Sequence, residues 1–212
     1  MKKKTKFVLI SDTHTMHRDV KVPDGDVLIH AGDITGQGEL DTIHDFNEWL
    51  GELPHKHKIV IAGNHDFCFP MDSPEWGKEK LSNCTYLQDE FVVVEGFKIW
   101  GSPWQPWFGG WHFNLDRGPQ IKEKWDLIPL DTDILVTHGP PDDILDWCFR
   151  GNKAGCVDLL NHIRKMKNLK MHVFGHIHES RGVANKDGVK FVNASTCTLG
   201  YRPTNQPFVV EL

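Results

Sequence analysis

The chain has 212 residues, of which 39% are hydrophobic and 25% charged, and its formal net charge is −5. This length suits one domain with its own core, and we expect a single domain over residues 1–212. No apolar run reaches the roughly 18 residues of a membrane helix, so we expect no membrane partner. The acidic balance disfavours a nucleic-acid partner but is compatible with a small anionic substrate held by metal.

The chain begins with a basic stretch, Lys2 to Lys4, and a short apolar run from Phe7 to Ile10. A signal peptide needs a longer apolar segment and a small-residue cleavage site, so we interpret the run as a strand and the lysines as solvated. The five cysteines are odd in number, scattered and without a CxxC pair, which argues against a disulfide framework. They favour reduced thiols and a cytoplasmic location.

Five short apolar runs, rich in Val and Ile, recur along the chain. They are too short for helices, and unbroken apolarity is typical of strands buried on both faces. Helical patterns at 38–52 and 154–166 lie between them, each with an apolar face. This alternation predicts a layered α/β fold. The runs cover residues 6–10, 26–30, 58–62, 133–137 and 171–174.

A second set of short, β-rich runs lies beside turn signals such as Glu95-Gly96, and we expect hairpins there. With the first set, these runs predict two packed sheets with helices outside, a two-sheet β-sandwich flanked by helices. Residues 102–119 are rich in Trp, Pro and Gly and are expected to form an ordered loop. The second set covers residues 85–88, 90–95, 97–101, 188–195 and 207–212.

Side chains of metal-ligating type follow each of the five buried runs. Ligands of open α/β sheets bind at this carboxyl edge of the strands. Asp, His and Asn without thiolates suit Mn²⁺, Fe, Zn²⁺ or Co²⁺. The seven candidates exceed what one ion needs, and they can serve two ions, the pair used in phosphoryl-ester hydrolysis, if one carboxylate bridges. The candidates are Asp12, His14, Asp33, Asn64, His138, His176 and His178.

Two pairs of candidates are spaced by two residues, Asp12 with His14 and His176 with His178. In an extended strand end such residues point the same way, so each pair is expected to face one cavity. Taken alone, a motif such as residues 11–14 is usually an N-cap turn. The ordered set of five, each directly after an apolar run, favours a metal site. Glycines that allow sharp turns stand at 32, 63, 139 and 175.

These motifs resemble the pattern of the calcineurin-like metallophosphoesterase superfamily, which is D-x-H, G-D, G-N-H-[DE], H and G-H-x-H. They occur here in that order between residues 10 and 180. The resemblance implies a four-layer αββα fold and a hydrolase with two divalent ions, Mn first, with Fe, Zn, Co or Ni as alternatives. It implies one ion held by Asp12, His14, Asp33 and His178, and another held by Asp33 as a bridge, Asn64, His138 and His176.

The same resemblance implies that Asp33 and His65 are catalytic and that Asn64, His65 and His176 contact substrate. A water between the ions loses a proton and attacks the phosphorus. His65 is carried over as a phosphate contact and general acid. Because neighbours in an extended segment point to opposite sides, we expect His65 to point away from Asn64 toward the substrate.

A narrower similarity, from Phe7 to about Val209, is to the metallophosphoesterase-domain-containing branch with class III-like cyclic-nucleotide phosphodiesterase activity. It implies a phosphodiesterase acting on cyclic nucleotides or similar small phosphodiesters, with a nuclease or a nucleotide phosphomonoesterase as alternatives. Some members have glycine in place of His176, and the histidine here implies a competent two-metal site. The GDxxDRG run of phosphoprotein phosphatases is absent, which disfavours that activity. The sequence leaves the oligomeric state open.

The sequence leaves two alternatives to weigh, a non-catalytic scaffold against an enzyme, and a packing role against a binding role for the aromatic residues. A non-catalytic scaffold would show the loss of a ligand, and none of the seven is missing. The aromatic residues of 101–118 either pack on the core or form a wall that stacks a nucleobase or an apolar leaving group.

Overall fold

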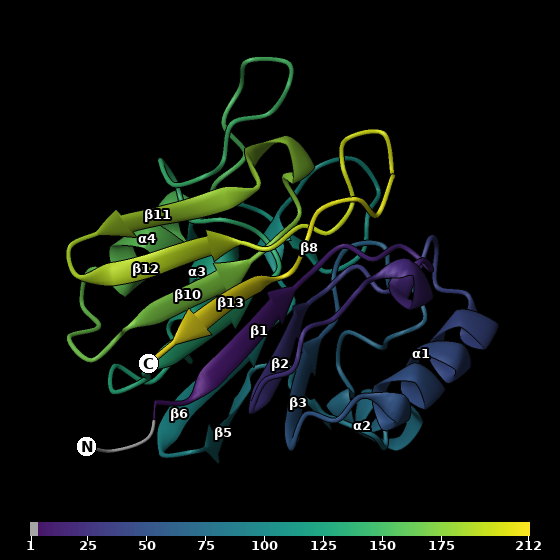
Figure 1. Ribbon diagram of the computed structural model, residues 1–212. Coiled ribbons are helices and arrows are strands. Elements are labelled where there is room, and N and C mark those ends of the chain that lie inside the picture. Colours follow the sequence, from purple (N-terminus) through teal and green to yellow (C-terminus); the bar gives the residue numbers. More distant parts are fainter. Residues whose placement is uncertain (1–3) are drawn as a thin grey trace.

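Two β-sheets packed face to face, with helices on their outer sides, form the centre of the molecule (Figure 1). The computed structural model describes residues 4–212, so Lys2 and Lys3 of the basic stretch lie outside the described residues. The predicted α/β fold of two packed sheets flanked by helices is confirmed. No helix within 4–212 is both long and apolar enough to cross a membrane.

The first sheet has the strand order β13-β1-β2-β3-β4. Its strands β1 to β4 run parallel, and β13 pairs antiparallel with β1 at the edge. Helices α1 and α2 connect β2 to β3 and β3 to β4. The bounds are β1 Lys6–Ile10, β2 Val27–Ala31, α1 Leu40–Glu52, β3 His57–Ile61, α2 Pro74–Lys80, β4 Thr85–Tyr86 and β13 Phe208–Glu211.

The second sheet has the order β11-β12-β10-β9-β6-β5, with parallel central strands and an antiparallel strand at each edge. Helices α3 and α4 lie on its outer side (Figure 1). The bounds are β5 Glu90–Val94, β6 Phe97–Ser102, α3 Pro119–Trp125, β9 Ile134–Thr137, α4 Val157–Ile163, β10 Met171–Phe174, β11 Gly182–Lys186 and β12 Val189–Asn193. The remaining short elements are η1 His17–Asp19, β7 Gln105–Pro106, β8 Asn114–Leu115 and η2 His178–Ser180.

The five buried runs all form strands, as predicted, whereas the hairpin prediction holds only in part. β5 and β6 form a hairpin through the turn at Glu95-Gly96. The hairpin prediction was wrong for 85–88 and 207–212, because β4 follows a crossover helix and pairs parallel with β3, and β13 pairs with the distant β1. The exposed strand β11 was not expected, nor was the pair β7–β8 inside the aromatic loop.

The apolar runs are unbroken because each strand packs into two hydrophobic cores, one between the sheets and one between a sheet and its helices. Along β1, Phe7 and Leu9 face the second sheet, whereas Val8 and Ile10 belong to the outer core that includes Phe46 of α1. A strand between a sheet and a helix layer has no solvent face, so its sequence shows no alternation. The same packing fixes the register that brings the carboxyl ends of β1, β2, β3, β9 and β10 together.

We expect Phe46→Ala to lower the free energy of unfolding by about 3–5 kcal/mol, since this side chain is fully buried between α1 and the first sheet. Phe149→Ala is the matched control, because that ring is 81% exposed and its loss should change stability by less than about 0.5 kcal/mol. Urea unfolding measures both. Equal losses in the two variants would show that the outer core is not formed as described.

Candidate metal centre

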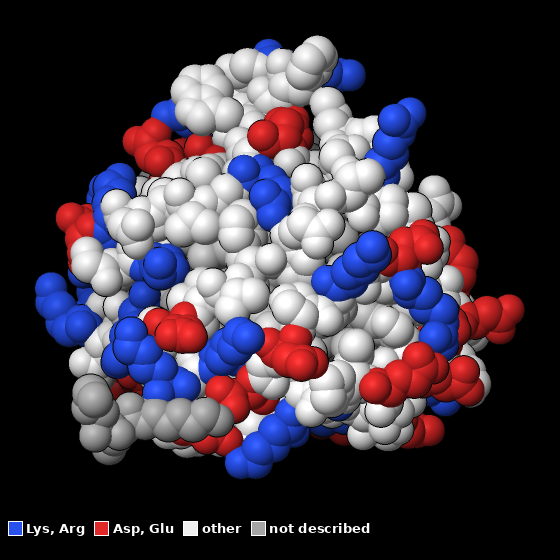
Figure 2. Space-filling model, viewed as in Figure 1, with Lys and Arg blue, Asp and Glu red and all other residues white. Residues whose placement is uncertain are grey.

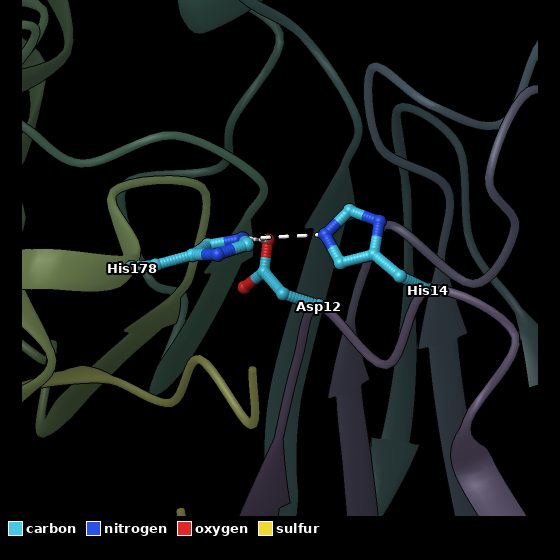
Figure 3. Close-up of side chains that lie close together, drawn as sticks. All are labelled: Asp12, His14 and His178. Carbon is cyan, nitrogen blue, oxygen red and sulfur yellow. Dashed lines mark hydrogen bonds and ion pairs between the residues drawn. The ribbon is translucent and has the colours of Figure 1, made fainter. Parts of the chain in front are cut away.

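One group of ligand-type side chains forms where β1 ends and β10 continues into η2. The imidazoles of His14 and His178 point toward the carboxylate of Asp12 (Figure 3). The two Nε2 atoms lie 3.2 Å apart, and His178 Nε2 lies 3.4 Å from Asp12 Oδ1. One ligand atom from each of the three residues lies within 4.8 Å of the other two. All three are buried.

A second group forms beside the first and shares the carboxylate of Asp33. Asp33 Oδ1 lies 3.3 Å from His138 Nε2, and these two residues group with His176 within 4.8 Å. Asn64 adds its Oδ1 at 2.9 Å from the same His138 nitrogen. The other oxygen of Asp33, Oδ2, lies 3.8 Å from His14 Nε2. Asp33 therefore lies between the two groups.

The structure brings all seven predicted ligands together, in two groups that match the two sets implied by the resemblance. Their binding of ions stays a prediction. Asp12 and His14 share one group as expected, but the backbone there is not extended, because Asp12, His14 and His176 have left-handed φ angles of 52°, 40° and 68°. His176 and His178 consequently belong to different groups of the same cluster. Backbone strain of this kind is concentrated at functional sites.

His65 lies beside the first group, in a turn and not in the extended segment that was expected. Asn64 and His65 therefore do not point to opposite sides as expected, and both face the site. His65 groups with His14 and Asp33 within 4.8 Å. Its backbone N–H donates to Asp33 Oδ1 at 2.9 Å, and its Nδ1–H donates to the carbonyl of Gly36 at 2.6 Å. Its Nε2 is left for the site.

Backbone carbonyls fix the tautomer of three histidines. The Nδ1–H of His14 donates to Thr35 at 3.3 Å, that of His138 to Ala31 at 2.9 Å and that of His178 to Thr198 at 3.0 Å. The Nε2 atoms therefore face the site, an orientation typical of metal-bound histidine.

The two carboxylates keep their charge although they are buried. Burial raises the pKa of Asp12 and Asp33, but the neighbouring histidines outweigh it and hold both pKa values below the ordinary range. Burial in turn lowers the pKa of His138 and His178, yet Asp33 and Asp12 raise these pKa values to about 9. Two buried anions thus draw positive charge to this place.

His14 and His176 have pKa values lowered by burial, to about 3 for His176. Both are therefore neutral at pH 7 and have a free lone pair. Neutral imidazoles, carboxylate oxygens and an amide oxygen form a donor set that fits Mn²⁺, Fe or Zn²⁺. The residues present thus suit a pair of divalent ions.

Two supporting residues were missed by the sequence analysis. Ser195 Oγ donates to Asp12 Oδ2 at 2.9 Å, across the junction of the two sheets. The buried carboxylate of Asp66 accepts backbone N–H groups of Ile34, Thr35 and Gly63 at 2.8–3.2 Å, which ties the Asp33 loop to the Asn64 loop. Asp66 could have been found from the sequence, since it is the last residue of the G-N-H-D motif. No comparable motif marks Ser195.

The aromatic loop packs partly on the core and partly on histidines of the site, and its contact with substrate stays a prediction. Trp104 and Phe113 are buried in the outer core. Trp111 packs on the His65 imidazole with ring centroids 4.1 Å apart, and Phe108 lies 4.9 Å from His176. A cavity of about 370 Å³ opens beside His176, with Phe108 and Arg117 among its lining residues.

Carboxylates and imidazoles cluster where the carboxyl ends of the strands of both sheets meet, which is the arrangement of a metallohydrolase centre. The sequence matches the calcineurin-like phosphoesterase family over residues 5–180, and the chain belongs to this family of metal-dependent phosphoesterases. Metallophosphoesterase domain-containing protein 1 of Homo sapiens is 48% identical over 231 residues, covering 98% of this chain and 71% of that protein. A UPF0046 protein of Caenorhabditis elegans is 40% identical, covering 99% and 81%.

Similarity to solved structures is weaker. One structure, described as a novel archaeal phosphodiesterase, has a TM-score of 0.48 at 17% identity and covers 98% of this chain and 99% of that chain.

We expect Gly175→Ala to weaken metal binding at least about 10-fold, because an added Cβ would collide with the Asp12 carboxylate and the Ser11 hydroxyl. Gly110→Ala is the matched control, since nothing lies within 4 Å of a Cβ there. Titration of metal-free protein with Mn²⁺ measures both affinities. An unchanged affinity in Gly175→Ala would mean that the position of Asp12 does not govern binding.

Proposed function

We propose that this protein is a phosphodiesterase that hydrolyses small phosphodiesters, with cyclic nucleotides as the first candidates, at a centre of two divalent ions. The family supports the reaction class. The two-ion part rests on one observation, the carboxylate of Asp33 between two groups of histidine ligands. Manganese is the first candidate for both ions.

The roles of the residues follow from their places in the centre. When bound, the ions supply an activated water and neutralise the charge that the phosphoryl oxygens gain. Asp33 would contact both ions, with His14, Asp12 and His178 on one side of it. Asn64, His138 and His176 would hold the other ion, and Asn64 and His176 also orient the substrate phosphate.

His65 is placed to move a proton. Its Nδ1–H is held by the Gly36 carbonyl, so the Nε2 of a protonated ring carries the proton that the leaving oxygen needs. Trp111 covers one face of the ring and limits the access of water to it. Deprotonated His65 could instead bind an ion, since it lies within reach of Asp33 and His14. The two roles predict different metal contents.

The surroundings of the centre support a small organic phosphodiester. Phe108 and Trp111 place aromatic rings beside His176 and His65, and the adjacent cavity has room for a base or another organic group. Lysine and arginine are interspersed with acidic residues on the face in Figure 2, which does not favour a long polyanion. All five cysteines are free, which supports a cytoplasmic location.

A substrate panel with Mn²⁺-loaded protein tests the proposal. We expect hydrolysis of 2′,3′- or 3′,5′-cyclic nucleotides and of aryl phosphodiesters to exceed that of nucleotide monoesters and single-stranded DNA. A preference for monoesters or for DNA would favour the phosphomonoesterase or the nuclease alternative. No hydrolysis of any ester would favour a non-catalytic scaffold.

We expect His176→Gly to bind one Mn²⁺ per chain where the parent binds two, and to lose activity while the fold is kept. The reason is that the group around Asp33 and His138 loses an imidazole. Elemental analysis and circular dichroism provide the measurements, and His44→Ala, at an exposed position of α1, is the control. Two ions and full activity in His176→Gly would remove His176 from the ligand set.

His65→Ala should lower kcat by about 10²–10⁴-fold on a substrate with a poor leaving group, the usual contribution of general acid catalysis. The loss should shrink on p-nitrophenyl esters, whose leaving group needs no proton, and metal content should equal that of the parent. Equal losses on both substrates would leave His65 as a phosphate contact only. A loss of one ion would make it a ligand.

A further inference from the structure

We infer that Tyr201 is a specificity-determining residue of this site, whose ring forms a wall for a planar organic group attached to the substrate phosphorus. This inference rests on the proposed function and deepens it. The ring of Tyr201 lies 4.9 Å from His14 and 5.4 Å from His178, centroid to centroid, and meets both imidazoles edge to face. It lies 6.2 Å from His65.

The position of Tyr201 is held by the same atom that orients a predicted ligand. The carbonyl of Thr198 accepts the Nδ1–H of His178 at 3.0 Å and the backbone N–H of Tyr201 at 2.8 Å. The side chain of Asn205 donates to the carbonyls of Ser195 and Cys197, which closes the base of the loop. This loop between β12 and β13, yellow in Figure 1, rises at the end of the molecule toward which β1 points. Tyr201 and His178 are therefore placed together.

The backbone at Tyr201 is strained in order to present the ring. Its φ is +54°, a left-handed conformation that is an outlier for a bulky side chain. Glycine or asparagine adopts it with less strain. Strain of this kind persists where the surrounding structure enforces it, and it is concentrated at ligand contacts. The same strain occurs at His14 and at Asp12, in the loop on which the ring packs.

Packing against the histidines does not by itself explain a tyrosine at this position, because 51% of the surface of Tyr201 remains exposed to solvent. A ring with one edge on the ligand imidazoles and the rest open offers a surface to whatever binds there. With phosphate oxygens at the ions, the organic group of the ester must lie along such a surface. Aromatic rings prefer planar partners that stack or meet them edge to face.

Binding of two phosphonates, phenylphosphonate and methylphosphonate, to Mn²⁺-loaded protein tests the inference by calorimetry, without turnover. They share the phosphoryl group and differ in the planar ring. The parent should bind the phenyl compound about 10-fold more tightly, which is the preference that one aromatic contact provides. Tyr201→Asn should reduce this preference several-fold, with Phe108 and Trp111 still present, and keep the affinity for methylphosphonate, since asparagine tolerates the left-handed backbone.

Two further variants locate the effect in the ring. Tyr201→Phe should keep the preference, because it removes only the hydroxyl. Leu199→Asn, in the same loop and also 51% exposed, should keep it too. A preference that is undiminished in Tyr201→Asn overturns the inference and leaves the proposed function intact. A parent that binds neither phosphonate overturns both.

Discussion

The buried carboxylate of Asp33 is the constraint around which the rest of the site is arranged. It is 2% exposed and lies between two histidine groups. One of its oxygens contacts His138, and the other approaches His14. An anion in such a place is costly unless cations or hydrogen bonds compensate it. The backbone N–H of His65 gives part of that compensation, and a pair of divalent ions would give the rest.

The fold serves this constraint through the parallel strands of both sheets. Their carboxyl ends meet at one edge, so ligands from segments more than 160 residues apart, Asp12 and His178, come within 3.4 Å. Left-handed residues then turn the chain so that the side chains converge, and Gly175 leaves room for the Asp12 carboxylate. Stability and function share these loops, since Asp66 and Ser195 tie them together through buried hydrogen bonds.

Much of this was predictable from the sequence, because strand burial and ligand chemistry are local properties. The run at 6–10 is apolar without alternation and is followed by Asp12 and His14, and the sequence shows both features directly. The left-handed turns at these ligands were not predictable, since this conformation is uncommon even for Asp and His, which adopt it more readily than most residues. Tyr201 was not predictable for the same reason, since its proposed role depends on contacts with residues distant in the sequence. Strand β4 was assigned to a hairpin because its partner is chosen by a crossover helix and not by a turn.

The central claim is that two ions share the Asp33 carboxylate. Electron paramagnetic resonance of protein loaded with Mn²⁺ tests it most directly, because ions joined by one carboxylate are magnetically coupled. We expect the parent to give the spectrum of an exchange-coupled pair, and Asp33→Asn to lose that coupling. A parent spectrum of isolated Mn²⁺ ions at full loading would contradict the account.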